Sequence, residues 1–182
     1  MVTSHSRRSK RVCTTCEFVT DIDTSVPSAP FHDGEGRGDT PASWTEHYIE
    51  AELRKIADHL QTEVEAYLVG GGAMALHQPS LKDTTKDIDL VVVDETALSR
   101  LMVVLDELGY EEVTDLGDEY DRLGARHCVR NDAGCQFDIF YRQIADKLFF
   151  SDGMQARSQQ FLSSEYFSVG LVSFEDILLF KA

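Results

Sequence analysis

Residues 85–93 read TKDIDLVVV, and this stretch decides the fold. Its apolar part is rich in β-branched residues and predicts a buried strand. Side chains alternate between the two faces of a strand, so Asp87 and Asp89 should share one face while Ile88 and Leu90 occupy the other. Two neighbouring carboxylates repel each other unless a divalent cation lies between them. The pair therefore predicts a cation site, with two solvated aspartates at a strand end as the alternative.

A third aspartate, Asp138, lies in the apolar sequence FDIF. Burying a carboxylate is costly unless it is paired or bound to a metal. Residues 131–134 (NDAG) predict a β-hairpin turn, and the hairpin can place Asp138 beside the strand that carries the first two aspartates. Three carboxylates on neighbouring strands would form a cage for one or two Mg²⁺ ions. The alternative is an ion pair between Asp138 and Arg126 or Arg130.

Three glycines, Gly70, Gly71 and Gly72, separate a short predicted strand at 66–69 from a short predicted helix at 73–77. Glycine lets the backbone approach a ligand closely, and a helix N-terminus offers free N–H groups to a phosphate. The spacing matches neither the dinucleotide-binding pattern nor the P-loop pattern. The glycines predict a phosphate-facing turn, with a tight turn of purely structural purpose as the alternative.

The remaining periodicity predicts helices packed on a mixed sheet. Apolar residues from Ile49 to Val64 recur at helical spacing, and Ser43 with Glu46 fits a capping box at the start of that helix. Asp94 should cap a third helix that ends before Gly109. Further predicted elements are a short strand near Tyr110, hairpin strands at 126–130 and 135–141, a last strand at 166–172 and a final helix capped by Ser173. This order indicates an α/β (α+β) fold, with a mixed sheet of about five strands flanked by helices.

Residues 1–42 are interpreted as a poorly ordered N-terminal tail, followed by one domain at 43–182 whose C-terminal helix is cut short. The tail has three of the four prolines and no apolar periodicity. Cys13 and Cys16 form a C-x₂-C pair, which leaves a small zinc-dependent regulator as an alternative, although a structural zinc site needs four ligands. Cys128 and Cys135 are expected to face each other across the hairpin as ordinary buried thiols.

The composition excludes some classes of protein. The chain has 182 residues, 42% of them hydrophobic, which is enough for one domain with a core. No apolar run approaches the ~18 residues of a membrane span, and no apolar segment follows the basic residues near the N-terminus. We therefore expect a cytoplasmic protein with no membrane partner. The net charge of −15 should repel nucleic-acid phosphates unless salt screens it, and it indicates a salt-adapted, halophilic protein.

Taken together, the motifs resemble the polymerase-beta-like nucleotidyltransferase superfamily, especially its small prokaryotic minimal and abortive-infection-type members. Three segments carry the resemblance, LVGG at 68–71, TKDIDL at 85–90 and FDI at 137–139, and it covers about residues 44–182. The resemblance implies a nucleotidyltransferase-like sheet. It also implies transfer of a nucleoside monophosphate from an NTP to an acceptor hydroxyl, with release of pyrophosphate.

The resemblance also implies a role for each motif. Asp87 and Asp89 would hold Mg²⁺ on the triphosphate, and Asp138 would complete a two-metal site and help to activate the acceptor. All three would thus be both catalytic and metal-binding. The expected nucleotide-binding residues are Gly70, Gly71, Gly72, Thr85 and Lys86.

The resemblance leaves the acceptor and the partners open. The acceptor could be a protein, an RNA or a small molecule. Larger relatives continue beyond the point at which the last predicted helix ends here, so a partner chain or an antitoxin could supply further surface, as in a toxin–antitoxin pair. The alternative function is a catalytically inactive binding or regulatory protein with the same fold.

Overall fold

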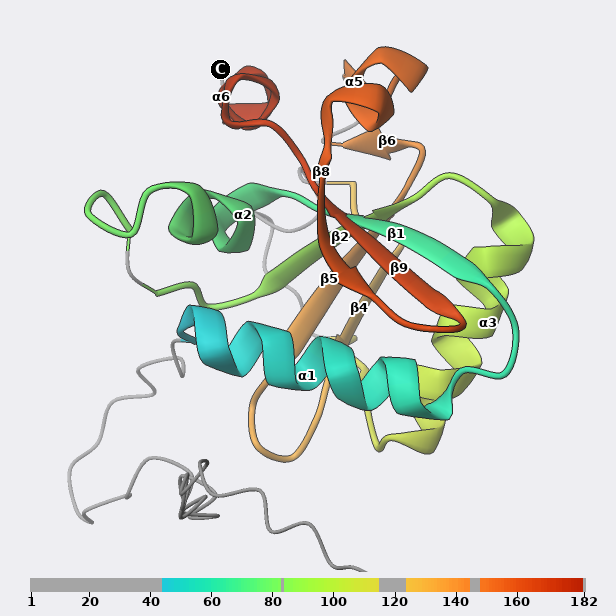
Figure 1. Cartoon of the computed structure of the whole chain (residues 1–182). Coiled ribbons are helices and arrows are strands. Elements are labelled where there is room, and N and C mark those ends of the chain that lie inside the picture. The colour runs from blue at the N-terminus through green and yellow to red at the C-terminus, as the bar shows by residue number, and fades with distance from the viewer. Residues whose placement is uncertain (1–43, 83, 115–123, 145–147, 182) are drawn as a thin grey trace, which may run out of the picture. The chain divides into compact units, whose positions relative to one another are not determined.

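The computed structural model describes residues 44–82, 84–114, 124–144 and 148–181 (Figure 1). The expected tail at 1–42, the Cys13–Cys16 pair and Ser43 lie outside the described residues. Within the described ranges, no helix is long and apolar enough to cross a membrane.

Seven of the described strands form one mixed sheet in the order β3-β4-β5-β2-β1-β9-β8. These strands are β1 (Val64–Leu68), β2 (Ile88–Val92), β3 (Glu111–Glu112), β4 (His127–Arg130), β5 (Gln136–Tyr141), β8 (Gln159–Ser163) and β9 (Phe167–Leu171). β1 runs parallel to β9 and β2 runs parallel to β5, while the other neighbouring pairs are antiparallel. The predicted mixed α+β class is confirmed, with seven strands in the sheet where about five were expected.

The helices are α1 (Glu46–His59), α2 (Gly70–His77), α3 (Glu95–Glu107), α5 (Asp152–Arg157) and α6 (Phe174–Lys181). The buried side of α1 carries Ile49, Leu53 and Ile56, which follow the predicted helical spacing. α1 contacts both α2 and α3, and α3 packs on β1 and β2, while α2 contacts α6 (Figure 1). The helices therefore bury the apolar residues that the periodicity singles out.

The predicted helix caps have different outcomes. Asp94 caps α3 by accepting a hydrogen bond from the Ala97 amide at 2.8 Å, as predicted. The capping box at Ser43 is wrong, because α1 begins after Thr45 and has no side-chain cap. Trp44 is instead held in extended backbone by a β-bridge to Thr85, with N···O distances of 2.6 and 2.9 Å. This pairing delays the start of the helix.

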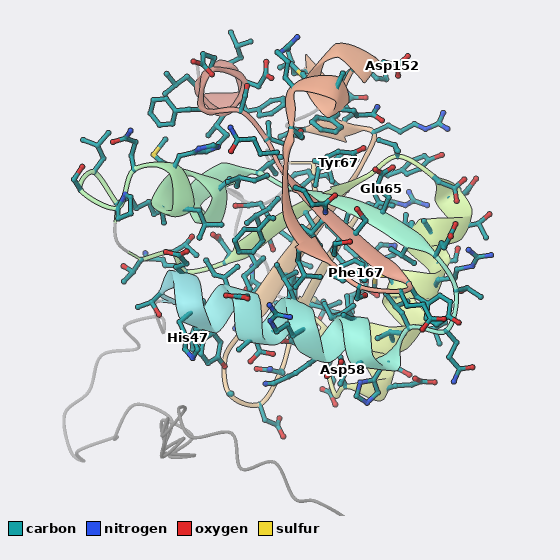
Figure 2. The ribbon with its side chains drawn as sticks, in the orientation of Figure 1. His47, Asp58, Glu65, Tyr67, Asp152 and Phe167 are labelled. Carbon is teal, nitrogen blue, oxygen red and sulfur yellow. The ribbon has the colours of Figure 1, made fainter. Side chains whose placement is uncertain are left out.

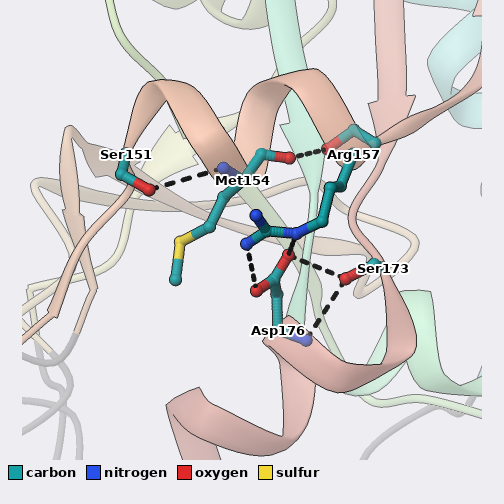
Figure 3. A network of polar contacts seen from close by, with 6 residues as sticks. Ser151, Met154, Arg157, Ser173 and Asp176 are labelled. Atoms are coloured by element: carbon teal, nitrogen blue, oxygen red, sulfur yellow. Dashed lines mark hydrogen bonds and ion pairs between the residues drawn. The ribbon is translucent and has the colours of Figure 1, made fainter.

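The region between the hairpin and the last strand contains the elements that the sequence analysis missed. They are α5, the edge strand β8, and a two-stranded sheet of β6 (Gln143–Ile144) and β7 (Leu148–Phe149). α5 is fastened to α6 because Arg157 donates two hydrogen bonds to Asp176, with Nη2–Oδ1 at 2.8 Å (Figure 3). Ser173 donates to the same carboxylate at 2.7 Å and caps α6, as expected.

One face of the sheet is covered by α1, and Asp138 lies on the other. Phe137 on β5 is fully buried, and its ring meets that of Tyr110 edge-on, with centroids 5.2 Å apart. The Tyr110 hydroxyl bonds Glu52 of α1, so α1 covers this face. The exposed residues His47 and Asp58 lie on the outer side of α1 (Figure 2). Asp138, next to Phe137 in β5, faces the other way.

Candidate functional site

Strand register brings the three predicted aspartates together. Asp89 of β2 and Asp138 of β5 are directly paired in the parallel ladder. Paired residues of adjacent strands share a face and lie on strands about 4.8 Å apart. Asp87 precedes Asp89 by two residues. The prediction that the hairpin would place Asp138 beside the strand of the other two aspartates is confirmed.

Asp138 is the most deeply buried of the three, with no exposed surface. Its Oδ1 accepts a hydrogen bond from Gln136 Nε2 at 2.7 Å, whereas Oδ2 is buried and has no hydrogen-bond partner. The alternative ion pair is not formed directly, because Arg130 donates to the Gln136 amide oxygen instead. Burial raises the pKa of Asp138 and the charge of Asp87 adds to this, against opposing contributions from Gln136, Cys128 and Arg130. Asp138 is therefore a buried carboxyl with one oxygen that lacks a hydrogen-bond partner.

Cys128 of β4 lies beside the same carboxylates, a placement that its sequence pattern did not predict. It pairs directly with Asp138 in the antiparallel β4–β5 ladder and is 5% exposed. Burial raises the pKa of its thiol to about 12, with further contributions from Asp138, Asp89 and Asp87. The expectation that Cys128 would face Cys135 is wrong, because Cys135 interacts with Tyr110 on the opposite face. The reason is that the hairpin loop is one residue longer than the NDAG sequence predicts, so that Arg130 pairs with Gln136 rather than with Cys135.

The glycine segment forms the first turn of α2 rather than a separate loop. Gly70 has a φ of +61°, and a Cβ on it would collide with the Asp89 carboxylate. The Gly71 amide donates to Asp89 Oδ2 at 3.2 Å. A Cβ on Gly72 would meet Ile49, its nearest neighbour, at an ordinary 3.7 Å. Glycine is thus required at position 70 for the close approach to Asp89, whereas a Cβ on Gly71 would meet Lys82 and Thr85 instead, and Gly72 has room for a Cβ.

The polar residues before β2 differ in their placement. Thr85 is 2% exposed, and its hydroxyl donates to the Asp87 carbonyl at 3.0 Å and lies 3.4 Å from the Asp87 carboxylate. Thr85 therefore positions Asp87. Lys86 is exposed. Lys82 was not foreseen as a site residue, but its ammonium group occupies the space that a Cβ on Gly71 would take.

The donor set fits a hard divalent cation in its chemistry. Mg²⁺ prefers carboxylate oxygens, and the three aspartates together with the unpartnered Asp138 Oδ2 supply them. As the side chains lie, no three His, Cys, Asp or Glu residues of the described ranges already surround a point that could hold a metal. Asp89 is engaged with the Gly71 amide. A cation would therefore have to draw Asp89 away from the turn.

A separate cavity of about 790 Å³ lies between α3 and the start of β4. Glu95, Arg126, His127 and Tyr141 are among its lining residues, and none of the three aspartates is. Size alone would favour this cavity as a binding site, but the chemistry of the buried carboxylates favours the other face of the sheet.

Comparison with known proteins identifies no relative. No family model, no curated protein and no solved structure matches the chain.

Proposed function

We propose that this domain is a Mg²⁺-dependent nucleotidyltransferase, which moves a nucleoside monophosphate from an NTP to an acceptor hydroxyl and releases pyrophosphate. One observation supports this most strongly: Asp138 is fully buried, has an unpartnered oxygen and lies directly beside Asp89. A buried carboxylate oxygen without a partner is costly unless a cation or a proton occupies it. A row of aspartates at one end of two parallel strands suits a cation that is held by oxygen.

The aspartates would divide the work. When bound, Mg²⁺ would offset negative charge on the triphosphate and on the leaving pyrophosphate. Asp87 and Asp89 are half-buried and would hold the metal–triphosphate complex. Asp138 would complete the metal site through Oδ2 and would help to activate the acceptor hydroxyl, because a cation held there lowers the pKa of a hydroxyl beside it.

The turn at the start of α2 would bind the phosphates. The Gly71 amide now donates to Asp89, and a phosphate oxygen would replace that acceptor when Asp89 turns to the cation. Gly70 and Gly72 belong to the same first helical turn. Lys82 would add a positive charge beside the turn, and Thr85 would keep Asp87 in place. Lys86 would reach the phosphates from the exposed segment before β2.

Calorimetry with each of the four NTPs, Mg²⁺ and molar KCl tests this proposal. We expect Asp89→Asn to weaken nucleotide binding at least about tenfold, because the lost carboxylate is a metal ligand. Asp58→Asn is the matched control, since it makes the same charge change on the outer side of α1. In a transfer assay, Asp138→Asn should slow the reaction at least about tenfold, because a ligand of the cation is lost. Nucleotide binding that survives both Asp87→Asn and Asp89→Asn unchanged would overturn the assignment.

A binding function without transfer is the second candidate, and the Gly71–Asp89 hydrogen bond favours it because the turn is occupied by the protein's own carboxylate. Absence of Mg²⁺–NTP binding, together with capture of a partner chain such as an antitoxin, would select this alternative. The acceptor, whether protein, RNA or small molecule, would be identified by incubation with labelled NTP.

We also place the protein in a salt-rich cytoplasm, because its net charge is −15. Its unfolding midpoint should rise with KCl. A midpoint that does not rise up to molar salt would contradict that placement.

A further inference from the structure

Cys128 is a site residue for which nucleotide transfer gives no role. It lies on β4, directly opposite Asp138 of β5, which is itself paired with Asp89 of β2. One thiol and two carboxylates therefore form a row across three adjacent strands on one face of the sheet. Cys128 is 5% exposed and Asp138 is fully buried.

One buried oxygen of Asp138 is the second observation that points to a ligand. Asp138 Oδ2 has no hydrogen-bond partner, although Oδ1 of the same carboxyl is bonded to Gln136. The Cys128 thiol lies within hydrogen-bonding reach of the Asp138 carboxyl, and this contact opposes the rise of the Asp138 pKa. Directly opposed residues of an antiparallel pair have Cβ atoms about 4.5–5.5 Å apart. Zinc–sulfur and zinc–oxygen bonds of about 2.3 and 2.0–2.2 Å bridge such a pair.

We propose that Cys128 and Asp138, joined by Asp89, form a binding site for a thiophilic divalent cation of the Zn²⁺, Co²⁺ or Cd²⁺ class. The proposal goes beyond nucleotide transfer and rests on strand register and burial alone. Formation of the sulfur–metal bond releases the Cys128 thiol proton to solvent, and nothing is oxidised or reduced. Three protein ligands then leave a fourth position for water, which is common for zinc.

The ligand types decide which cation the row selects. Thiolate ligands favour zinc and similar soft cations, whereas Mg²⁺ takes oxygen ligands. A Mg²⁺ ion would use the aspartates and ignore Cys128, while a thiophilic cation would be centred nearer to β4. Because Asp89 is bonded to the Gly71 amide, it must leave that amide for the site to close. Thiophilic cations should consequently compete with Mg²⁺ for Asp89 and Asp138.

Cobalt titration of the full chain tests the proposal, because a thiolate ligand gives a sulfur-to-cobalt charge-transfer band that oxygen ligands alone do not. Cys13 and Cys16 are first replaced by Ser, so that the remaining thiols are Cys128 and Cys135. We expect the band to persist in this background, to vanish with Cys128→Ser, and to remain with the matched control Cys135→Ser. Asp138→Asn should weaken cobalt binding at least about tenfold.

Absence of the band in the Cys13/Cys16-substituted background would overturn the proposal, and so would its loss with Cys135→Ser but not with Cys128→Ser. Circular dichroism establishes that each variant is folded. If Cys128→Ser is not folded, Cys128→Ala replaces it, and Cd²⁺ should raise the unfolding midpoint of the background but not of that variant. Asp87→Asn separates the two proposals, because it should abolish Mg²⁺–NTP binding and leave the cobalt band. The loss of Mg²⁺–NTP binding tests the proposed nucleotidyltransferase function, and the cobalt band tests the thiophilic site, so each proposal can fail without the other.

Discussion

Two buried carboxylates on opposite faces of the sheet, Glu52 and Asp138, have different surroundings. Glu52 is 2% exposed, and both of its oxygens are partnered, Oε1 by Lys55 at 2.7 Å and Oε2 by Tyr110 at 3.0 Å. Asp138 is more deeply buried, yet only one of its oxygens is partnered. Burial first, and then the neighbouring Cys135 and Glu52, raises the pKa of Tyr110, which keeps its hydroxyl protonated as a donor. Glu52 therefore has the surroundings of a structural carboxylate, while the unpartnered oxygen of Asp138 is the feature on which our proposal of a cation site rests.

The largest difference in stability should appear when each of these two carboxylates is replaced in turn. Glu52→Leu leaves the buried Tyr110 hydroxyl without its acceptor, so we expect the free energy of unfolding to fall by about 1–3 kcal/mol. Asp138→Asn removes a charge whose burial opposes folding, and it should leave stability unchanged or raise it. Urea denaturation in molar KCl with EDTA measures both. Equal losses for the two variants would mean that Asp138 is a structural residue as well.

The next effect sharpens the comparison at the turn that touches Asp89. Gly70→Ala should destabilise the protein by about 1–2 kcal/mol, because its left-handed backbone disfavours a side chain. The added Cβ would also collide with the Asp89 carboxylate where it meets the turn, which adds to the loss of stability. Gly72→Ala is the control within the same helical turn, and it should stabilise α2 by about 0.5–1 kcal/mol because Ala is the better helix former.

Thermal unfolding and calorimetry compare the two glycine variants. If Gly72→Ala lowered the stability as much as Gly70→Ala does, the fold would require glycines throughout this segment rather than at position 70. The assignment of the close approach to Gly70 would then be wrong.

Much of the fold could be predicted from the sequence because the decisive elements have strong local signals. The β-branched run after Asp87 forms β2, and Asp94 caps α3. The placement of Asp138 beside β2 followed from a recognisable hairpin turn. β8 has a mostly exposed, polar sequence at the sheet edge, and such a strand depends on its partner rather than on its own pattern.

The part of the candidate site that could not be predicted depends on one residue of register. NDAG suggested a four-residue loop, but Cys135 belongs to the turn, because its amide bonds the Asn131 side chain and its carbonyl accepts from the Asn131 amide. This extra loop residue shifts the register by one, so that Cys128 pairs with Asp138 instead of with Phe137. A register shift of one residue moves every side chain of a strand to the opposite face of the sheet. The position of the Cys128 thiol beside the carboxylates could therefore not be predicted from the sequence.

The smallest effect concerns acid pH, where Asp138 and Asp176 should act with opposite sign. Burial raises the pKa of Asp138, so the stability it contributes is present below its unfolded-state pKa and is lost as the pH rises through the folded-state value. The Arg157 guanidinium, aided by Ser173, lowers the pKa of Asp176 (Figure 3). Its contribution is therefore present above the unfolded-state pKa and is lost as the pH falls through the folded-state value.

The stability of two variants relative to the unchanged protein, measured from acid to neutral pH without metal, separates these contributions. The advantage of Asp138→Asn should grow as the pH rises and then level off above the raised pKa of Asp138. The deficit of Arg157→Gln should be present at neutral pH and disappear in acid, because Asp176 is then protonated in both proteins. The second change should be the smaller, since the Arg157 side chain is 57% exposed and solvent screens its ion pair. An Asp138→Asn difference that does not vary with pH would show that this carboxyl is not held protonated by its burial.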